Sequence, residues 1–143
     1  MWDRIFAVNV KSVWHCCKAV MPAMRSQGSG AILNIASVVA MAGQPGYLHY
    51  VASKGAVPSM TKGLAKEVGK HGVRINCIAP GFVIADATRD RPVEWQQSFL
   101  KARAIGREQR PDDLMGSAAY LFSDLASFVS GQTIVIDGGH IMY

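Results

Sequence analysis

The apolar positions of the first 25 residues follow the period of an amphipathic helix. They recur at steps of three and four residues, and the stripe consists of Trp2, Phe6, Val13, Cys16, Val20 and Met24. This spacing predicts one helix over residues 2–25. Pro22 is expected to bend or weaken its last turn, and the polar, glycine-containing residues 26–30 are expected to end it.

Short apolar runs alternate with further helical patterns along the rest of the chain. The runs that have the length and β-branched content of buried strands are 31–37, 73–78 and 132–136. The other predicted helices are 49–70, 93–104 and 111–124, with loops over 38–48 and 81–92. Strands that alternate with helices indicate crossover connections. The chain is therefore predicted to have an α/β fold with about three parallel strands and flanking helices.

The helix expected over residues 49–70 contains a proline. Pro58 has no amide hydrogen to donate to the carbonyl of Lys54, so a local kink is expected there. Several small residues in the same segment indicate a helix that other backbone segments can approach closely.

Composition narrows the range of functions. The chain has 143 residues, of which 50% are hydrophobic and 17% are charged, as expected for one packed domain. The formal charge is +5, but the fifteen Lys and Arg residues are scattered, without a basic run interleaved with aromatic residues. Nucleic-acid binding is therefore not expected.

The cysteine pattern and the apolar segments bear on the compartment. Cys16, Cys17 and Cys77 are odd in number and form no disulfide framework, which favours a reducing, cytoplasmic location. The most apolar stretch, residues 31–43, is too short and too polar to cross a bilayer, and the first residues lack the pattern of a signal peptide. The four histidines share no spacing typical of metal ligands, so no metal site is expected.

Three polar residues stand where the strand 31–37 meets the next helix. Ser37 ends the strand, and Tyr50 and Lys54, four residues apart, share one face of the helix. In open parallel sheets, ligands bind beyond the carboxyl ends of the strands. The arrangement of Ser37 followed by Tyr-x-x-x-Lys resembles the active site of the short-chain dehydrogenase/reductase family.

Other segments match that family in the same order along the chain. They are Phe6-Ala7-Val8-Asn9-Val10, Ile32-Leu33-Asn34-Ile35-Ala36-Ser37, Tyr50-Val51-Ala52-Ser53-Lys54, Asn76, Pro80-Gly81, and Gly131-Gln132 through Asp137-Gly138-Gly139. The resemblance covers essentially the whole chain, but only the C-terminal half of the family's fold. It implies part of a doubly wound, Rossmann-type sheet.

The resemblance also implies an activity, which is the interconversion of a ketone and a secondary alcohol with NAD or NADP. Tyr50 would exchange a proton with the substrate oxygen, Ser37 would bind that oxygen, and Lys54 would hold the nicotinamide ribose. Asn9 would hold a water that relays protons from Lys54. A free phenol, with a pKa near ~10, is a poor base at neutral pH, so Lys54 is expected to stabilise the Tyr50 phenolate.

The loop after residue 78 resembles the segment where the family meets the nicotinamide. Pro80, Gly81 and Val83 would belong to the cofactor site, with the backbone of Val83 bonding the carboxamide. Ala85 stands where the family usually has threonine, so a hydroxyl expected near the cofactor is replaced. The resemblance further implies a small-molecule substrate and a homodimer or homotetramer.

Each candidate residue also has a structural explanation. Ser37 can close the strand end, Tyr50 can be half-buried packing, and Lys54 can be a solvated side chain. Asn9 lies on the apolar stripe, so it is expected to be buried and can bond neighbouring backbone. The combined spacing favours the catalytic explanation.

The glycine-rich turn that receives a dinucleotide pyrophosphate has no counterpart in these residues. Residues 1–143 are therefore expected to be one partial NAD(P)-binding domain, either a fragment or a chain whose true start lies upstream of Met1. Two hypotheses remain: an oxidoreductase completed by another half, or a non-catalytic fragment that associates with intact family members. The substrate, and the choice between NAD and NADP, cannot be read from these residues.

Overall fold

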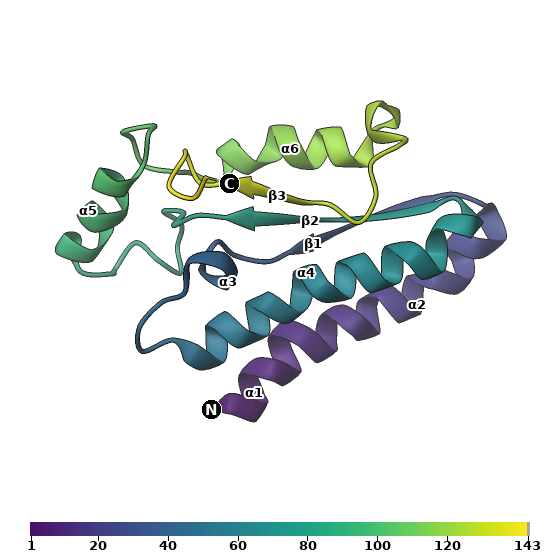
Figure 1. Ribbon diagram of the computed structural model, residues 1–143, viewed down its shortest axis with the longest axis horizontal. Helices are drawn as coiled ribbons and strands as arrows, with labels where there is room; N and C mark the ends of the chain where they lie inside the picture. The colour runs from purple at the N-terminus through teal and green to yellow at the C-terminus, as the bar shows by residue number, and fades with distance from the viewer. Residues whose placement is uncertain (143) are drawn as a thin grey trace.

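A three-stranded parallel sheet forms the centre of the protein. The structure, a computed structural model, describes residues 1–142. Strands β1 (Gly30–Ile35), β2 (Val73–Pro80) and β3 (Thr133–Ile136) lie in the order β1-β2-β3, and both pairings are parallel. This confirms the predicted α/β fold and places β2 between the other two strands (Figure 1).

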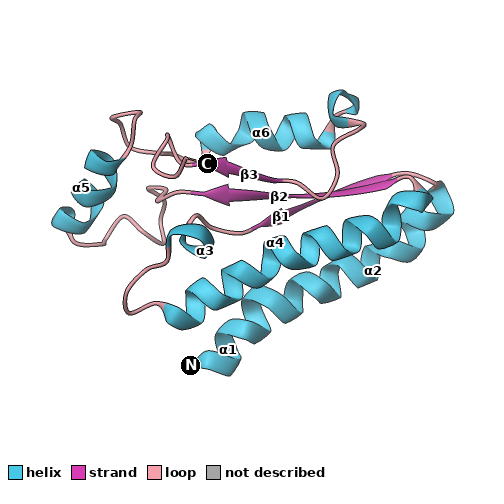
Figure 2. Cartoon of the chain, viewed as in Figure 1, coloured by secondary structure: helices cyan, strands magenta, loops and turns pink. Residues whose placement is uncertain are grey.

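Helices cover both faces of the sheet (Figure 2). The α-helices are α1 (Trp2–Phe6), α2 (Ser12–Gln27), α3 (Val39–Ala42), α4 (Leu48–Val68), α5 (Val93–Ala102) and α6 (Asp112–Phe122). A π-helical segment, Ala7–Lys11, joins α1 to α2, and 3₁₀ turns occupy Gly69–His71 and Asp124–Ala126. Helices α2 and α4 lie on one face, α6 lies on the other, and α5 lies beyond the carboxyl ends of the strands (Figure 1).

Several element boundaries differ from the sequence prediction. The first helix is interrupted by the π segment at Ala7–Lys11, which a three- and four-residue apolar stripe does not distinguish from an unbroken helix. The expected loop over residues 38–48 contains the short helix α3. Helix α2 continues past Pro22 to Gln27, beyond the predicted end at residue 25, and α4 includes Pro58 within one helix. The bends expected at the two prolines stay predictions.

Strand β2 is buried along almost its whole length because apolar layers pack on both of its faces. On the side of α2 and α4, the buried cluster consists of Cys17, Met21, Leu64, Val68, Val73 and Ile75. A second cluster on that side joins Val57 of α4 to Cys77 and Ala79. On the side of α6, Ile78 packs with Leu121 and Ala126. Burial on both faces explains why β2 reads as a nearly continuous apolar run.

One polar group is enclosed between these helices and β1. Asn34, only 6% exposed, donates from Nδ2 to Thr61 Oγ1 at 2.9 Å, and Thr61 Oγ1 donates to the carbonyl of Val57 at 2.9 Å. A buried amide that loses its partner carries the full cost of its desolvation. The Asn34–Thr61 bond therefore links β1 to α4 beneath the candidate site.

We predict that Thr61→Val lowers the free energy of unfolding by about 1–3 kcal/mol, because it leaves the Asn34 amide without its acceptor. The measurement is urea unfolding followed by circular dichroism. Ser59→Ala on the same helix removes an exposed hydroxyl and should change the midpoint little. Equal effects of the two substitutions would show that the buried hydrogen bond contributes nothing specific.

Candidate active site

The candidate site lies at the carboxyl ends of β1 and β2. Two further hydrogen bonds continue the pairing beyond the end of β1: Ala36 N–H donates to Ile78 O at 2.8 Å, and Val38 N–H donates to Pro80 O at 3.0 Å. Ser37 is therefore held beside the end of β2. Its hydroxyl accepts a hydrogen bond from Val39 N–H at 3.4 Å, at the start of α3, so Ser37 also has the structural role that serine commonly takes beside a loop.

Ser37 and Tyr50 line the same cavity. Tyr50 lies in the first turn of α4, and the cavity, of about 490 Å³, also reaches Gly81 and Val83 in the loop after β2. Residues that are distant in sequence thus meet at the carboxyl ends of the strands, where parallel α/β folds bind ligands. The structure brings together these four of the predicted site residues.

Lys54 and Asn9 face a different hollow. Both line a groove of about 500 Å³ that runs along β1. The Lys54 Nζ donates to the carbonyl of Ile35 at 3.0 Å and lies 5.9 Å from the centroid of the Tyr50 ring. Lys54 thus lines the groove and does not line the cavity that contains Tyr50.

The side chain of Asn9 is linked to the backbone carbonyl of Tyr50 through the hydroxyl of Ser53. It is partly buried rather than fully buried as expected, and it lies in the π segment before α2. Its Nδ2 donates to Ser53 Oγ at 3.0 Å, and Ser53 Oγ donates to the carbonyl of Tyr50 at 2.8 Å. The side chain thus satisfies a neighbouring hydroxyl and helps to hold the start of α4.

The electrostatic environment opposes ionisation of both Tyr50 and Lys54. Burial raises the pKa of the Tyr50 phenol above its ordinary value, and a hydrogen bond from the Ser37 side chain lowers it in part. Burial lowers the pKa of Lys54, and the nearby Cys77 thiolate form raises it. The expected stabilisation of the phenolate by Lys54 is not found in this structure, because the ammonium is directed to Ile35 O and the phenol is desolvated.

The loop after β2 is held at a close approach of backbone segments. Pro80 is buried at the end of β2, and Gly81 N–H donates to Ile136 O at 2.9 Å. A Cβ at Gly81 would lie 2.8 Å from the Cβ of Asp137 and 2.9 Å from Gln109 Oε1, so only glycine fits. Within residues 1–142 the Val83 amide donates no hydrogen bond, which leaves this donor free beside the cavity.

The hydroxyl of Thr88 bonds the backbone of the loop that contains Ala85. Its Oγ1 accepts from Ala85 N–H at 2.9 Å and donates to the carbonyl of Val83. The hydroxyl therefore stabilises the loop itself. Threonine three residues after Ala85 is a local side-chain-to-backbone pattern that the sequence contained, but its partners required the folded loop.

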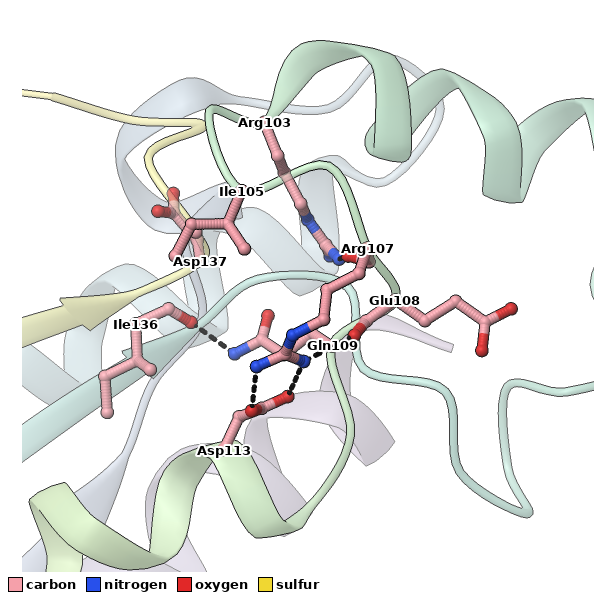
Figure 3. A pocket seen from close by; sticks show the side chains of 9 residues that line it. Arg103, Ile105, Arg107, Glu108, Gln109, Asp113, Ile136 and Asp137 are labelled. Atoms are coloured by element: carbon pink, nitrogen blue, oxygen red, sulfur yellow. Dashed lines mark hydrogen bonds and ion pairs between the residues drawn. The ribbon is translucent and has the colours of Figure 1, made fainter.

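The sequence did not reveal the role of residues 103–109, which lie beside the end of β3 (Figure 3). Arg103, 9% exposed, donates from its guanidinium to the carbonyls of Phe82 and Arg107. Gln109 Nε2 donates to Ile136 O at 2.6 Å, and Gln109 O accepts from Ile84 N–H at 2.8 Å. These bonds tie residues 103–109 to the loop after β2.

The Asp137-Gly138-Gly139 motif follows the carboxyl end of β3. The Asp137 carboxylate accepts three backbone N–H bonds, from Gly139, His140 and Ile141, at 3.0, 3.2 and 2.8 Å. The φ of Gly138 and Gly139 are 72° and 79°, in the left-handed region that favours glycine. The motif is therefore a turn that its own aspartate stabilises.

We predict that the Tyr50 phenol titrates above 10.0 in this chain and that Ser37→Ala raises its pKa further, since the serine is the group that lowers it. The folded state then holds the phenolic proton more tightly than the unfolded state does. Its stabilising effect is present below about pH 10 and is lost as the pH rises through the folded pKa. The measurement is absorbance at 295 nm, with Tyr50→Phe to identify the signal. A phenol that titrates below 10 would contradict the burial argument.

Comparison with known proteins identifies the family of the chain. The family described as enoyl-(acyl carrier protein) reductase matches residues 1–140. The 3-oxoacyl-[acyl-carrier-protein] reductase FabG of Chlamydia trachomatis is 38% identical over 138 residues, which are 96% of this chain and 56% of that protein. The chain thus spans little more than half the length of the relative it matches.

Solved structures share the fold at high similarity. The gluconate 5-dehydrogenase of Burkholderia cenocepacia, in complex with NADP and tartrate, has a TM-score of 0.92 and 34% identity over 97% of this chain and 55% of its own. The 3-oxoacyl-[acyl-carrier protein] reductase of Brucella melitensis has a TM-score of 0.93 and 30% identity over 99% of this chain and 53% of its own. A match over nearly every residue shows that the chain belongs to the short-chain dehydrogenase/reductase family.

Proposed function

We propose that this chain contributes the catalytic half of an NAD(P)-dependent oxidoreductase that interconverts a ketone and a secondary alcohol. The observation that supports the proposal is the cavity of about 490 Å³ in which Ser37 and Tyr50 meet beside the free amide of Val83. The family membership and the order of the motifs agree with it. Because the chain spans about half of its relatives, the activity belongs to a protein that includes the other half.

The neutral phenol suits the reduction of a carbonyl. In that direction the carbonyl oxygen accepts a hydrogen bond from the Ser37 hydroxyl and receives the proton of Tyr50. A raised pKa keeps that proton on Tyr50 at neutral pH, which is the form needed for donation. In the reverse direction Tyr50, as the phenolate, takes the proton of the alcohol. The resemblance assigns the stabilisation of that charge to Lys54, whose ammonium would have to leave Ile35 O to provide it.

Asn9 and Lys54 would act from the groove that runs along β1. Both line it, so a water between them could pass protons from Lys54, as the resemblance implies. Asn9 also acts as a positioning residue, because its bond to Ser53 supports the carbonyl of Tyr50.

The residues fit the nicotinamide and ribose end of NAD or NADP. The amide of Val83 is a free backbone donor for a carboxamide. Lys54, which here donates to Ile35 O, would turn to the ribose hydroxyls when the cofactor is bound. Pro80 and Gly81 hold the backbone before Val83 in place. When bound, the cofactor supplies or accepts the hydride. The glycine-rich pyrophosphate site would come from the other half, and a homodimer or homotetramer remains part of the proposal.

We expect measurable ketone reduction once residues 1–143 are joined to the N-terminal half of the Brucella melitensis reductase. In that fusion Tyr50→Phe should lower kcat roughly 10²–10⁴-fold, because it removes the group that donates the proton. The measurement is NADPH or NADH oxidation at 340 nm with a 3-oxoacyl thioester.

Tyr120→Phe is the matched control, since Tyr120 is 40% exposed on α6 and does not line the cavity. Retention of activity in the Tyr50→Phe fusion would overturn the assignment of Tyr50.

The free edge of β1 supports a second candidate, a non-catalytic chain that associates with another family member. Because Ala36 N–H faces β2 and the direction of backbone groups alternates, the backbone groups of Ala31, Leu33 and Ile35 face away from the sheet. The groove of about 500 Å³ follows this edge. An unpaired edge with an apolar groove beside it is a site for strand addition.

If this edge receives a strand, Ala31→Pro should weaken association with the N-terminal half of the Brucella melitensis reductase at least tenfold, because it removes an amide that faces the added strand. Analytical ultracentrifugation of the mixture measures it, and Ala31→Val, which keeps the amide, is the control. Fluorescence titration of this chain with NADH and NADPH separates the two candidates. Micromolar binding of either cofactor would contradict the non-catalytic one.

A further inference from the structure

The cavity that contains Ser37 and Tyr50 has an aromatic wall. Phe82 lies with its ring centroid 5.0 Å from that of Trp95 and 5.1 Å from that of Phe99, and the Trp95 and Phe99 centroids are 4.8 Å apart. All three residues line the cavity, and Tyr47 adds a fourth ring. Flat, apolar surfaces of this kind favour a ligand whose body is apolar or aromatic.

Seven side chains of the lining carry polar groups: Ser37, Gln44, Tyr47, His49, Tyr50, Thr88 and Arg91. Thr88 uses its hydroxyl on the backbone of its own loop, bonding Ala85 N–H and Val83 O. Ser37 and Tyr50 are assigned to the reacting oxygen by the proposed function. Gln44, Tyr47 and His49 remain as further polar partners, so the lining can receive a polar group of the substrate besides the reacting oxygen.

Arg91 is the permanently charged side chain of the lining, which contains no carboxylate. It comes from the loop before α5, with its guanidinium carbon 5.8 Å from the centroid of the Trp95 ring. Within residues 1–142 Arg91 forms no ion pair, whereas its neighbour Arg89 is paired with Asp86.

The loop that carries Arg91 is tied to α5. Gln96 Nε2 donates to the carbonyl of Arg91 at 2.7 Å and to that of Arg89 at 3.1 Å. The backbone of Arg91 is thus fixed against the helix that supplies Trp95 and Phe99. An unpaired guanidinium held over an aromatic wall is a ready partner for a planar carboxylate.

We propose that the site selects an apolar ketone or secondary alcohol that bears one carboxylate, with Arg91 as the specificity-determining residue. The inference rests on the proposed function for the reacting end, where Ser37 and Tyr50 receive the ketone oxygen. It adds that the aromatic wall takes the body of the substrate and that Arg91 takes its acid group. A 3-oxo acid with an aryl group has all three parts.

The test compares benzoylacetate with its uncharged ethyl ester, using the full chain without cofactor. Binding is measured from the ¹H–¹⁵N shift of the Trp95 indole, which Trp95→Phe identifies. Benzoylacetate should bind roughly two- to fivefold more tightly than the ester, as for other solvent-accessible ion pairs, and added salt should reduce the ratio.

Arg91→Gln should reduce the ratio of affinities to about one and leave the affinity for the ester unchanged. Lys101→Gln is the matched control, because it removes an equal charge from the exposed face of α5 and should preserve the ratio. Equal affinities in the unmodified chain, a ratio that survives Arg91→Gln, or no binding of either compound at millimolar concentration would overturn the inference.

The result of this binding test can be distinguished from the result of the activity test of the proposed function. Charge-dependent binding in a chain whose fusion is inactive would leave the inference standing without the activity. Activity on neutral ketones that is insensitive to Arg91→Gln would leave the activity without the inference.

Discussion

The parallel pairing of β1 with β2, continued past the end of β1, is the constraint on which the candidate site depends. Two backbone hydrogen bonds, from Ala36 to Ile78 O and from Val38 to Pro80 O, hold the chain on either side of Ser37. β2 can hold these residues in place because it is paired on both edges and buried on both faces. The loop after β2 begins at the same point, which brings Gly81 and Val83 to the cavity.

The Lys54 ammonium is bonded to the backbone of β1 rather than to the phenol of Tyr50. It satisfies the carbonyl of Ile35, a group that faces the unpaired edge of β1. Within this structure the chain favours a neutral tyrosine, because burial raises the pKa of Tyr50.

The cavity combines parts from segments that have no sequence relation to one another. The serine follows β1, the tyrosine begins α4, and the aromatic wall and Arg91 come from the region between β2 and α6. Arg103 and Gln109 hold that region against the strand ends, so the wall is fixed by backbone contacts rather than by a continuous element (Figure 3).

Residues 1–142 include no helix that is long and apolar enough to cross a membrane.

The sequence by itself determined the fold class, the three strands and the family, because apolar periodicity and motif spacing are local properties of the chain. It also named Ser37 and Tyr50, which do share a cavity, whereas the roles of all four predicted catalytic residues stay predictions. Only the tertiary structure decided that Lys54 and Asn9 face a separate groove, that burial raises the pKa of Tyr50, and that the Thr88 hydroxyl bonds the backbone of Ala85 and Val83. Desolvation and side-chain direction depend on which distant segments pack together, and spacing along a chain contains no measure of either.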